Sequence, residues 1–162
     1  MHIRRRISEK LSTFHTLRFP YTNPFASGHR YEAVVGIGGN IGDVQRRFEH
    51  LFFTLKREKR VDIVRTSLIL KNPPFGYHNQ DDFFNSIMVL KTSMQALPFL
   101  NYLLRLEKKF ARKRSFKDAP RTLDLDIIFF DNRVINKKNL IVPHPSWHKR
   151  ESVVIPLAGV HK

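Results

Sequence analysis

The chain has 162 residues and no cysteine, which suits one domain with a buried core and excludes disulfide scaffolds and thiolate metal sites. Its 29 Lys and Arg residues outweigh 14 Asp and Glu residues, and the formal charge of +15 favours polyanionic ligands such as nucleotides, nucleic acid or an anionic membrane surface. No apolar run reaches the roughly 18 residues of a membrane span, and no segment has the long apolar core of a secretory signal.

Residues 1–30 are predicted to be a basic N-terminal extension. Arg4, Arg5 and Arg6 stand near its start, and prolines and a glycine interrupt any long element. The pattern allows a short helix over 7–17, but we expect a loosely ordered extension without a chemical role. A basic arm or a targeting-like segment is the alternative interpretation.

The folded domain is predicted to span residues 31–162. Residues 33–38 have the pattern of a buried strand, and the glycine-rich segment 39–43 follows it. Such a turn can cradle phosphate, but its glycine spacing matches neither a dinucleotide fingerprint nor a Walker loop, so a tight strand-to-helix turn is favoured. Asp43 is placed to cap a helix. The apolar face of that helix is predicted to contain Val44, Phe48, Leu51 and Leu55.

Two further strands, over 61–70 and 83–90, are predicted on either side of a stiff loop. Asn72-Pro73-Pro74-Phe75-Gly76 is extended because each proline fixes φ and removes a backbone donor. A rigid loop that presents an aromatic ring can line a pocket for a flat ligand, although a simple linker explains the same residues. Asn85 shares an otherwise apolar strand face, where its amide can read the edge of a heterocycle or bond nearby backbone.

A helix from Pro98 to about Phe110 is predicted next, with Glu107 on its apolar stripe. The dense run of cations at 112–117 follows directly. Because like charges repel, we expect this loop to be mobile when empty and to settle on a polyphosphate. A solvated run of charges is the alternative interpretation.

The segment 120–130 is predicted to be a central strand that organises the site, because apolar residues alternate and then run continuously. Asp124 and Asp126 share one strand face with Cα atoms roughly 6.5–7 Å apart, so both carboxylates can reach one or two hard cations. A divalent ion such as Mg²⁺ relieves the repulsion between two acids on a mostly buried strand. The alternative is a solvated pair of acids bonded to Arg or Lys.

Short strands are predicted at 134–135 and 140–142, ahead of Pro143-His144-Pro145. The two prolines hold His144 in an extended pose, where it can contact a phosphate or a sugar, although a single histidine is more often structural. Residues 153–157 are predicted to close the core.

Together these motifs resemble those of the 6-hydroxymethyl-7,8-dihydropterin pyrophosphokinase family of folate biosynthesis. The most specific element is Arg121-Thr122-Leu123-Asp124-Leu125-Asp126-Ile127. Weaker elements follow in the family's order: Gly36-Ile37-Gly38-Gly39-Asn40, Asn72-Pro73-Pro74-Phe75-Gly76, Phe83-Phe84-Asn85 and Val142-Pro143-His144-Pro145. The resemblance covers about residues 31–160.

The resemblance implies an α+β fold, a three-layer α/β/α sandwich with a largely antiparallel sheet related to the ferredoxin-like plan. It implies a cytoplasmic, ATP-dependent diphosphotransferase that moves diphosphate from ATP to the hydroxymethyl oxygen of the pterin and releases AMP. Two Mg²⁺ ions are the expected cofactor, and ATP and the pterin are the expected partners. The chain is expected to be a monomer that binds neither membrane nor nucleic acid.

Carried over position by position, the resemblance implies the roles of individual residues. The expected metal ligands are Asp124 and Asp126, and the expected catalytic residues are Arg112, Arg114 and Arg121. Expected to bind ATP are Glu107, Arg112, Arg121, Ile127, His144 and Arg150. Expected to form the pterin slot are Asn72, Pro73, Pro74, Phe75, Phe83 and Asn85. Ser152 stands where the family usually has an aromatic that stacks on the pterin, and Trp147 is a candidate substitute.

Two other functions remain open from the sequence. A basic nucleic-acid-binding module explains the charge, but it requires aromatics interleaved with cations on an exposed face, whereas most phenylalanines here lie in core-like runs. A family member that binds pterin or ATP without turnover would account for Ser152.

Overall fold

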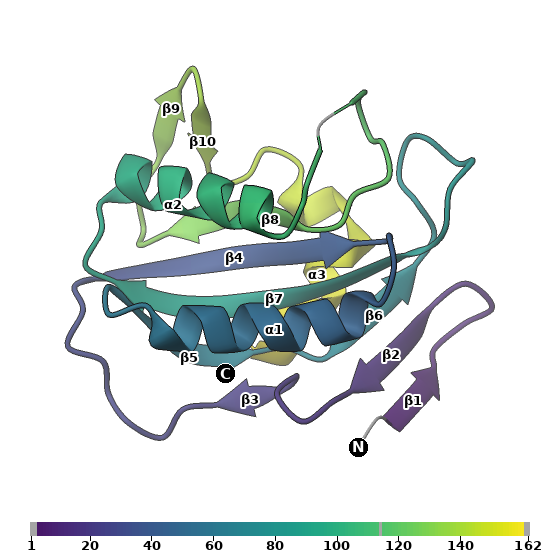
Figure 1. The fold of residues 1–162 in the computed structure, drawn as a ribbon, viewed down its shortest axis with the longest axis horizontal. Coiled ribbons are helices and arrows are strands. Elements are labelled where there is room, and N and C mark those ends of the chain that lie inside the picture. The colour runs from purple at the N-terminus through teal and green to yellow at the C-terminus, as the bar shows by residue number, and fades with distance from the viewer. Residues whose placement is uncertain (1–2, 114, 161–162) are drawn as a thin grey trace.

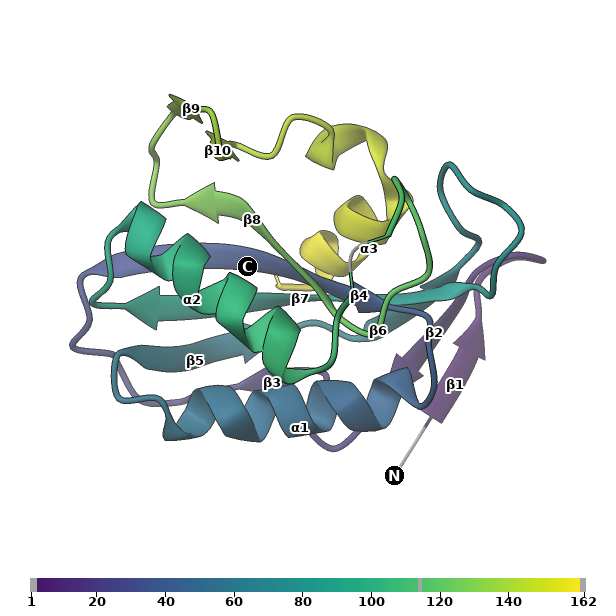
Figure 2. The same ribbon diagram turned by 45° about the horizontal axis from the view of Figure 1, so that its top comes forward.

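The computed structural model describes residues 3–113 and 115–160, and these form three layers (Figure 1). Helices α1 (Val44–Arg57) and α2 (Ala96–Lys109) cover one face of a sheet, and helix α3 (Glu151–Val160) covers the other (Figure 2). The predicted α+β sandwich is confirmed. None of the described helices has the length and apolar character needed to span a bilayer.

The large sheet is antiparallel in every described pairing. Its strands are β1 (Ile3–Arg6), β2 (Ser12–His15), β3 (Tyr21–Thr22), β4 (Tyr31–Gly39), β5 (Val61–Thr66), β6 (Ile69–Asn72), β7 (Phe83–Thr92) and β8 (Asp124–Phe130). A separate hairpin pairs β9 (Ile135–Lys137) with β10 (Leu140–Val142). The order β4-α1-β5-β7-α2-β8, with β8, β4, β7 and β5 side by side, is the ferredoxin-like plan.

Helix α1 begins where the sequence predicted. The side chain of Asp43 accepts a hydrogen bond from the backbone N–H of Arg46 at 3.1 Å, which satisfies one of the free donors at the helix start. All four residues of the predicted apolar face are buried: Val44, Phe48, Leu51 and Leu55. Helix α1 therefore packs its apolar stripe onto the sheet as an amphipathic helix does.

The predicted strand over 61–70 is interrupted at Ser67 and Leu68, which separate β5 from β6. The backbone N–H of Ser67 donates to the carbonyl of Ile87, and its hydroxyl lies 2.8 Å from that of Ser86. Both β5 and β6 pair with β7, so the break bends the strand without detaching it from its neighbour.

The N-terminal segment contradicts the expectation of a loosely ordered extension or a short helix. Strands β1 and β2 extend the sheet beyond β6, and β3 pairs with β5. Phe19 is fully buried and lies against Phe48 and Phe52 of α1. The open edges of β5 and β6 offer backbone partners to this segment, and burial of Phe19 removes apolar surface from water.

Strand β8 was predicted to be central, but it forms an edge of the described sheet and pairs there with β4. Its apolar run is continuous because both faces are covered. Ile127 packs in the α1–α2 core, whereas Ile128 packs with residues of α3. A bulge near Ile128 puts both that residue and Phe129 on the α3 side.

Candidate active site

The two aspartates of β8 lie beside glycines of β4. In the antiparallel ladder, Asp124 is paired with Gly38 and Asp126 with Gly36. A Cβ atom on Gly38 would come within 2.5 Å of the Oδ1 atom of Asn85, so glycine is needed there to leave room for that amide. The glycines keep open the sheet face toward which both carboxylates point.

Three hollows meet at Asp126, which lines each of them. The first hollow is further lined by Asp124 and by four of the residues predicted for the pterin slot: Asn72, Phe75, Phe83 and Asn85. The second hollow lies at the basic loop and is lined by residues that include Arg112, Lys113, Arg121 and His144. The third hollow is mainly apolar, with Leu100, Ile127, Leu140 and Ile141 in its wall.

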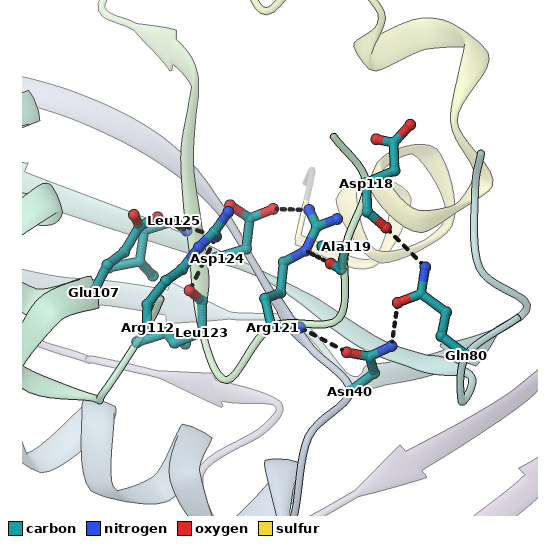
Figure 3. Close-up of polar contacts among 10 residues, drawn as sticks. All are labelled: Asn40, Gln80, Glu107, Arg112, Asp118, Ala119, Arg121, Leu123, Asp124 and Leu125. Carbon is teal, nitrogen blue, oxygen red and sulfur yellow. Dashed lines mark hydrogen bonds and ion pairs between the residues drawn. The ribbon is translucent and has the colours of Figure 1, made fainter. Parts of the chain in front are cut away.

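Asp124 is bonded to two arginines (Figure 3). The Nη1 atom of Arg112 donates to Oδ1 at 2.7 Å, and the Nη1 atom of Arg121 donates to Oδ2 at 3.1 Å. Both guanidinium groups are largely buried, so these charge-assisted bonds are stronger than surface ion pairs. The two predicted phosphate-binding arginines therefore neutralise a predicted metal ligand. Arg114 lies outside the described residues.

Within the part of the chain that the structure describes, Asp126 forms no ion pair like those of Asp124. Burial raises the pKa of Asp126 to about 7, with further contributions from the charges of Asp124 and Glu107; Arg150 and Arg112 act in the opposite direction. A buried carboxyl that resists ionisation beside a second carboxylate is a favourable place for a hard cation.

Glu107 is almost fully buried in α2, behind β8. Its Oε2 atom accepts a hydrogen bond from the backbone N–H of Leu125 at 2.8 Å and lies 3.7 Å from Nη1 of Arg112. The carboxylate therefore holds the start of β8 and one arginine in place, rather than lying at the rim as many helix glutamates do. A direct contact of Glu107 with ATP stays a prediction.

The first hollow has amides at its edge and aromatic rings in its wall. Asn85 Nδ2 donates to Asn72 Oδ1 at 2.7 Å. The guanidinium of Arg121 lies over the ring of Phe83 at 5.0 Å, and that of Arg150 lies over Phe75 at 4.8 Å. Both rings already have a guanidinium group on one face. The same faces can stack against a charged or polarised part of a ligand.

The remaining residues predicted for the slot are placed differently. Pro73 and Pro74 are not among the lining residues of the first hollow, and they connect Asn72 to Phe75. Ser152 does line it. Trp147 instead packs on Phe129 at 5.1 Å, in a separate hollow further along the α3 side of the sheet. This position does not support the suggestion that Trp147 replaces the missing aromatic, because Trp147 is not among the residues that line the first hollow.

His144 lines both the second and the third hollow and is half-buried. Its Nδ1 atom accepts the backbone N–H of Ser146 at 3.3 Å. Burial, and then the charge of Arg150, lower the pKa of His144, so the ring is neutral near pH 7 and carries its proton on Nε2. With no hydrogen-bond partner for it among the described residues, that N–H can donate to an anionic oxygen between the two hollows.

Two residues that were not predicted join the loops around the site (Figure 3). Asn40 Nδ2 donates to Gln80 Oε1 at 2.9 Å, and Gln80 Nε2 donates to the carbonyl of Asp118 at 2.8 Å. The loop between β6 and β7 is thereby tied to the loop that precedes β8. Asn40 lies in the glycine-rich motif, but the sequence gives no sign of a partner forty residues away.

Residues 34–162 match the model of the family described as 7,8-dihydro-6-hydroxymethylpterin-pyrophosphokinase. The chain belongs to this family. Membership confirms the predicted activity class, an ATP-dependent diphosphotransferase of folate biosynthesis.

Bacterial relatives support the same assignment, and each is a 2-amino-4-hydroxy-6-hydroxymethyldihydropteridine pyrophosphokinase. The relative from Campylobacter jejuni is 42% identical over 142 residues, which cover 88% of this chain and 90% of the relative. The relative from Helicobacter pylori is 40% identical over 127 residues, covering 77% and 78% of the two chains. The relative from Bacillus subtilis is 34% identical over 128 residues, covering 79% and 77%.

Proposed function

We propose that this pyrophosphokinase transfers diphosphate from ATP to the hydroxymethyl group of 6-hydroxymethyl-7,8-dihydropterin, releasing AMP, at the point where the three hollows meet. The observation that supports this location is that Asp126 lines all three hollows. Transfer between two substrates requires that both reach the same charged centre. Hollows that share Asp126 allow this.

In the proposal, Asp124 and Asp126 hold two Mg²⁺ ions. The described residues contain no cluster of three carboxylates or histidines that could hold a metal alone, which suits an ion that takes its remaining ligands from phosphates and water. The raised pKa of Asp126 reflects burial beside two other carboxylates, an environment that a divalent cation would relieve, so the donor set fits such an ion. When bound, such ions neutralise charge on the phosphates and lower the pKa of a coordinated hydroxyl.

Arg112 and Arg121 change partners in this proposal. Both bond to Asp124. With Asp124 serving as a metal ligand, the two guanidinium groups would be available to phosphate oxygens in the second hollow, where their charge would stabilise the transferred group. His144 donates a hydrogen bond from its Nε2–H to a neighbouring phosphate oxygen. Arg114 is expected to bind phosphate together with the other two arginines.

The first hollow is proposed to hold the pterin and the third to hold adenosine. Asn72 and Asn85 supply donors and acceptors for the edge of the heterocycle, and the ring of Phe83 supplies a face once Arg121 moves to phosphate. The apolar wall of the third hollow, around Ile127, suits a purine. We further propose that the chain acts as a monomer and that the reaction takes place in the cytoplasm, where ATP is available.

Product analysis tests the reaction. The purified chain is incubated with ATP, Mg²⁺ and the pterin, and the nucleotides are separated. AMP that forms only when the pterin is present is the expected result. ADP would contradict diphosphate transfer. ATP binding without any turnover would favour a family member that binds its substrates but does not react them.

A further inference from the structure

One row of paired residues crosses the sheet from its N-terminal edge to the acid pair. The row consists of Arg5, Thr13, Leu70, Asn85, Gly38 and Asp124. Figures 1 and 2 both place β1 and β2 beside β6, at the end of the sheet opposite β8. The N-terminal hairpin is therefore continuous with the strand layer that carries the first hollow.

Strand β2 pairs with the strand that presents Asn72. Ser12 is opposite Lys71, the residue that precedes Asn72, and Lys71 is opposite Phe84 of β7. Strand β6 has four residues, so without β2 it would be a short edge strand with unpaired backbone groups on one side. Pairing on both sides fixes the position from which the Asn72 amide reaches Asn85.

Phe14 of β2 makes an aromatic side-chain contact between the hairpin and β7. Its ring packs against that of Phe84 at 5.7 Å between centroids, with both side chains half-buried. Phe84 stands between Phe83 and Asn85, and side chains on a strand alternate faces. The Phe14–Phe84 contact thus supports, from the opposite face, the stretch of β7 that lines the first hollow.

We propose that the β1–β2 hairpin is a positioning element for the pterin slot and that Phe14 is its principal positioning residue. This inference rests on the proposed function, because it presumes that the first hollow binds the pterin. The hairpin acts by limiting the motion of Asn72, Phe83 and Asn85, and it does not touch the substrate. ATP, which is proposed to occupy the other two hollows, should be much less affected.

The test compares Phe14→Ala with the wild type in the full chain. The KM for the pterin is expected to rise roughly threefold to tenfold, the range that corresponds to loss of one aromatic pair. The KM for ATP is expected to stay within about twofold. Amide hydrogen exchange should become faster in β6 and in 83–85. Phe14→Tyr, which keeps the ring, should restore the wild-type KM for the pterin and the wild-type rate of amide exchange.

Phe25→Ala is the matched control, since Phe25 belongs to the same N-terminal segment but is 81% exposed. It should leave both KM values and the exchange of β6 unchanged. A pterin KM that is unchanged in Phe14→Ala would overturn the inference. So would equal rises in both KM values together with lower global stability, because those would indicate a merely structural role.

Failure of the proposed function is recognised separately. If the wild type forms no AMP but binds the pterin, pterin affinity measured by fluorescence replaces KM in the same comparison. If the wild type does not bind the pterin at all, the inference is overturned together with the proposed function. A wild type that turns over normally beside an unaffected Phe14→Ala variant overturns the inference alone.

Discussion

Asn40 and Arg121 hydrogen-bond each other in both directions. The backbone N–H of Arg121 donates to Asn40 Oδ1, and the backbone N–H of Asn40 donates to the carbonyl of Arg121, each at 2.9 Å. The same Arg121 donates to Asp124 through its guanidinium. The turn after β4 therefore fixes the backbone of a residue whose side chain we propose to bind phosphate.

Gln80→Ala should weaken turnover without unfolding the protein. The change removes the bonds from Gln80 to Asn40 and to the Asp118 carbonyl, so the two loops are no longer tied together. We expect kcat/KM for the pterin to fall roughly tenfold, as the loss of one or two hydrogen bonds predicts. Steady-state kinetics measure it, with the exposed neighbour Asn79→Ala as the control. Equal kinetics in both variants would contradict the role of Gln80.

Arg121→Ala should cost about 10²–10³ in kcat, because it removes a charge placed to stabilise the transferred phosphates. The backbone bonds to Asn40 remain, so the loop should keep its position. Arg121→Lys keeps the charge but loses the planar fork and should recover only part of the rate. Single-turnover measurements separate this chemical effect from ATP binding, and a full rate in Arg121→Ala would refute it.

Asp124→Asn and Asp126→Asn should both lower turnover by at least about a thousandfold, because each removes a proposed metal ligand. Their effects on stability should differ in sign. Asp124→Asn leaves Arg112 and Arg121 without their carboxylate and should lower the free energy of unfolding by about 1–3 kcal/mol. Asp126→Asn removes a charge that burial disfavours and should raise the free energy of unfolding. Denaturant unfolding without Mg²⁺ measures both, and equal signs would contradict the charge balance described above.

The stabilising effect of Asp126→Asn should depend on pH. The pKa of Asp126 is about 7 in the folded chain against an ordinary 3.8, so the folded state holds this proton more tightly than the unfolded state. The contribution of the protonated carboxyl is fully present below about 3.8 and is lost as the pH rises to about 7. The variant should therefore gain stability relative to the wild type from pH 4 to pH 7, by an amount on the order of 1–4 kcal/mol, and no more above it. A difference that is constant with pH would contradict the raised pKa.

Much of the site could be predicted because its signals are local in sequence. Asp124 and Asp126 are two residues apart, so strand geometry alone puts them on one face. The amide of Asn85 was conspicuous on an apolar strand face, and it does line the first hollow. For these residues, the residue type and its spacing along the chain are enough to predict a place in the site.

What the sequence did not predict depends on distant partners. Strand β2 forms because β6 offers an open edge some fifty residues later, and Gln80 gains its role from Asn40. A continuous apolar run is the same for a central strand and for an edge strand covered on both faces, which is why β8 was misplaced. The position of Trp147 follows from a bulge at Ile128, for which the sequence has no marker.

A crystal structure with Mg²⁺, the pterin and a non-hydrolysable ATP analogue would test the central claim most directly. We expect metal density between Asp124 and Asp126, the pterin beside Asn85, and the guanidinium of Arg121 bonded to a phosphate oxygen. Metal bound elsewhere, with Arg112 and Arg121 still bonded to Asp124, would contradict it.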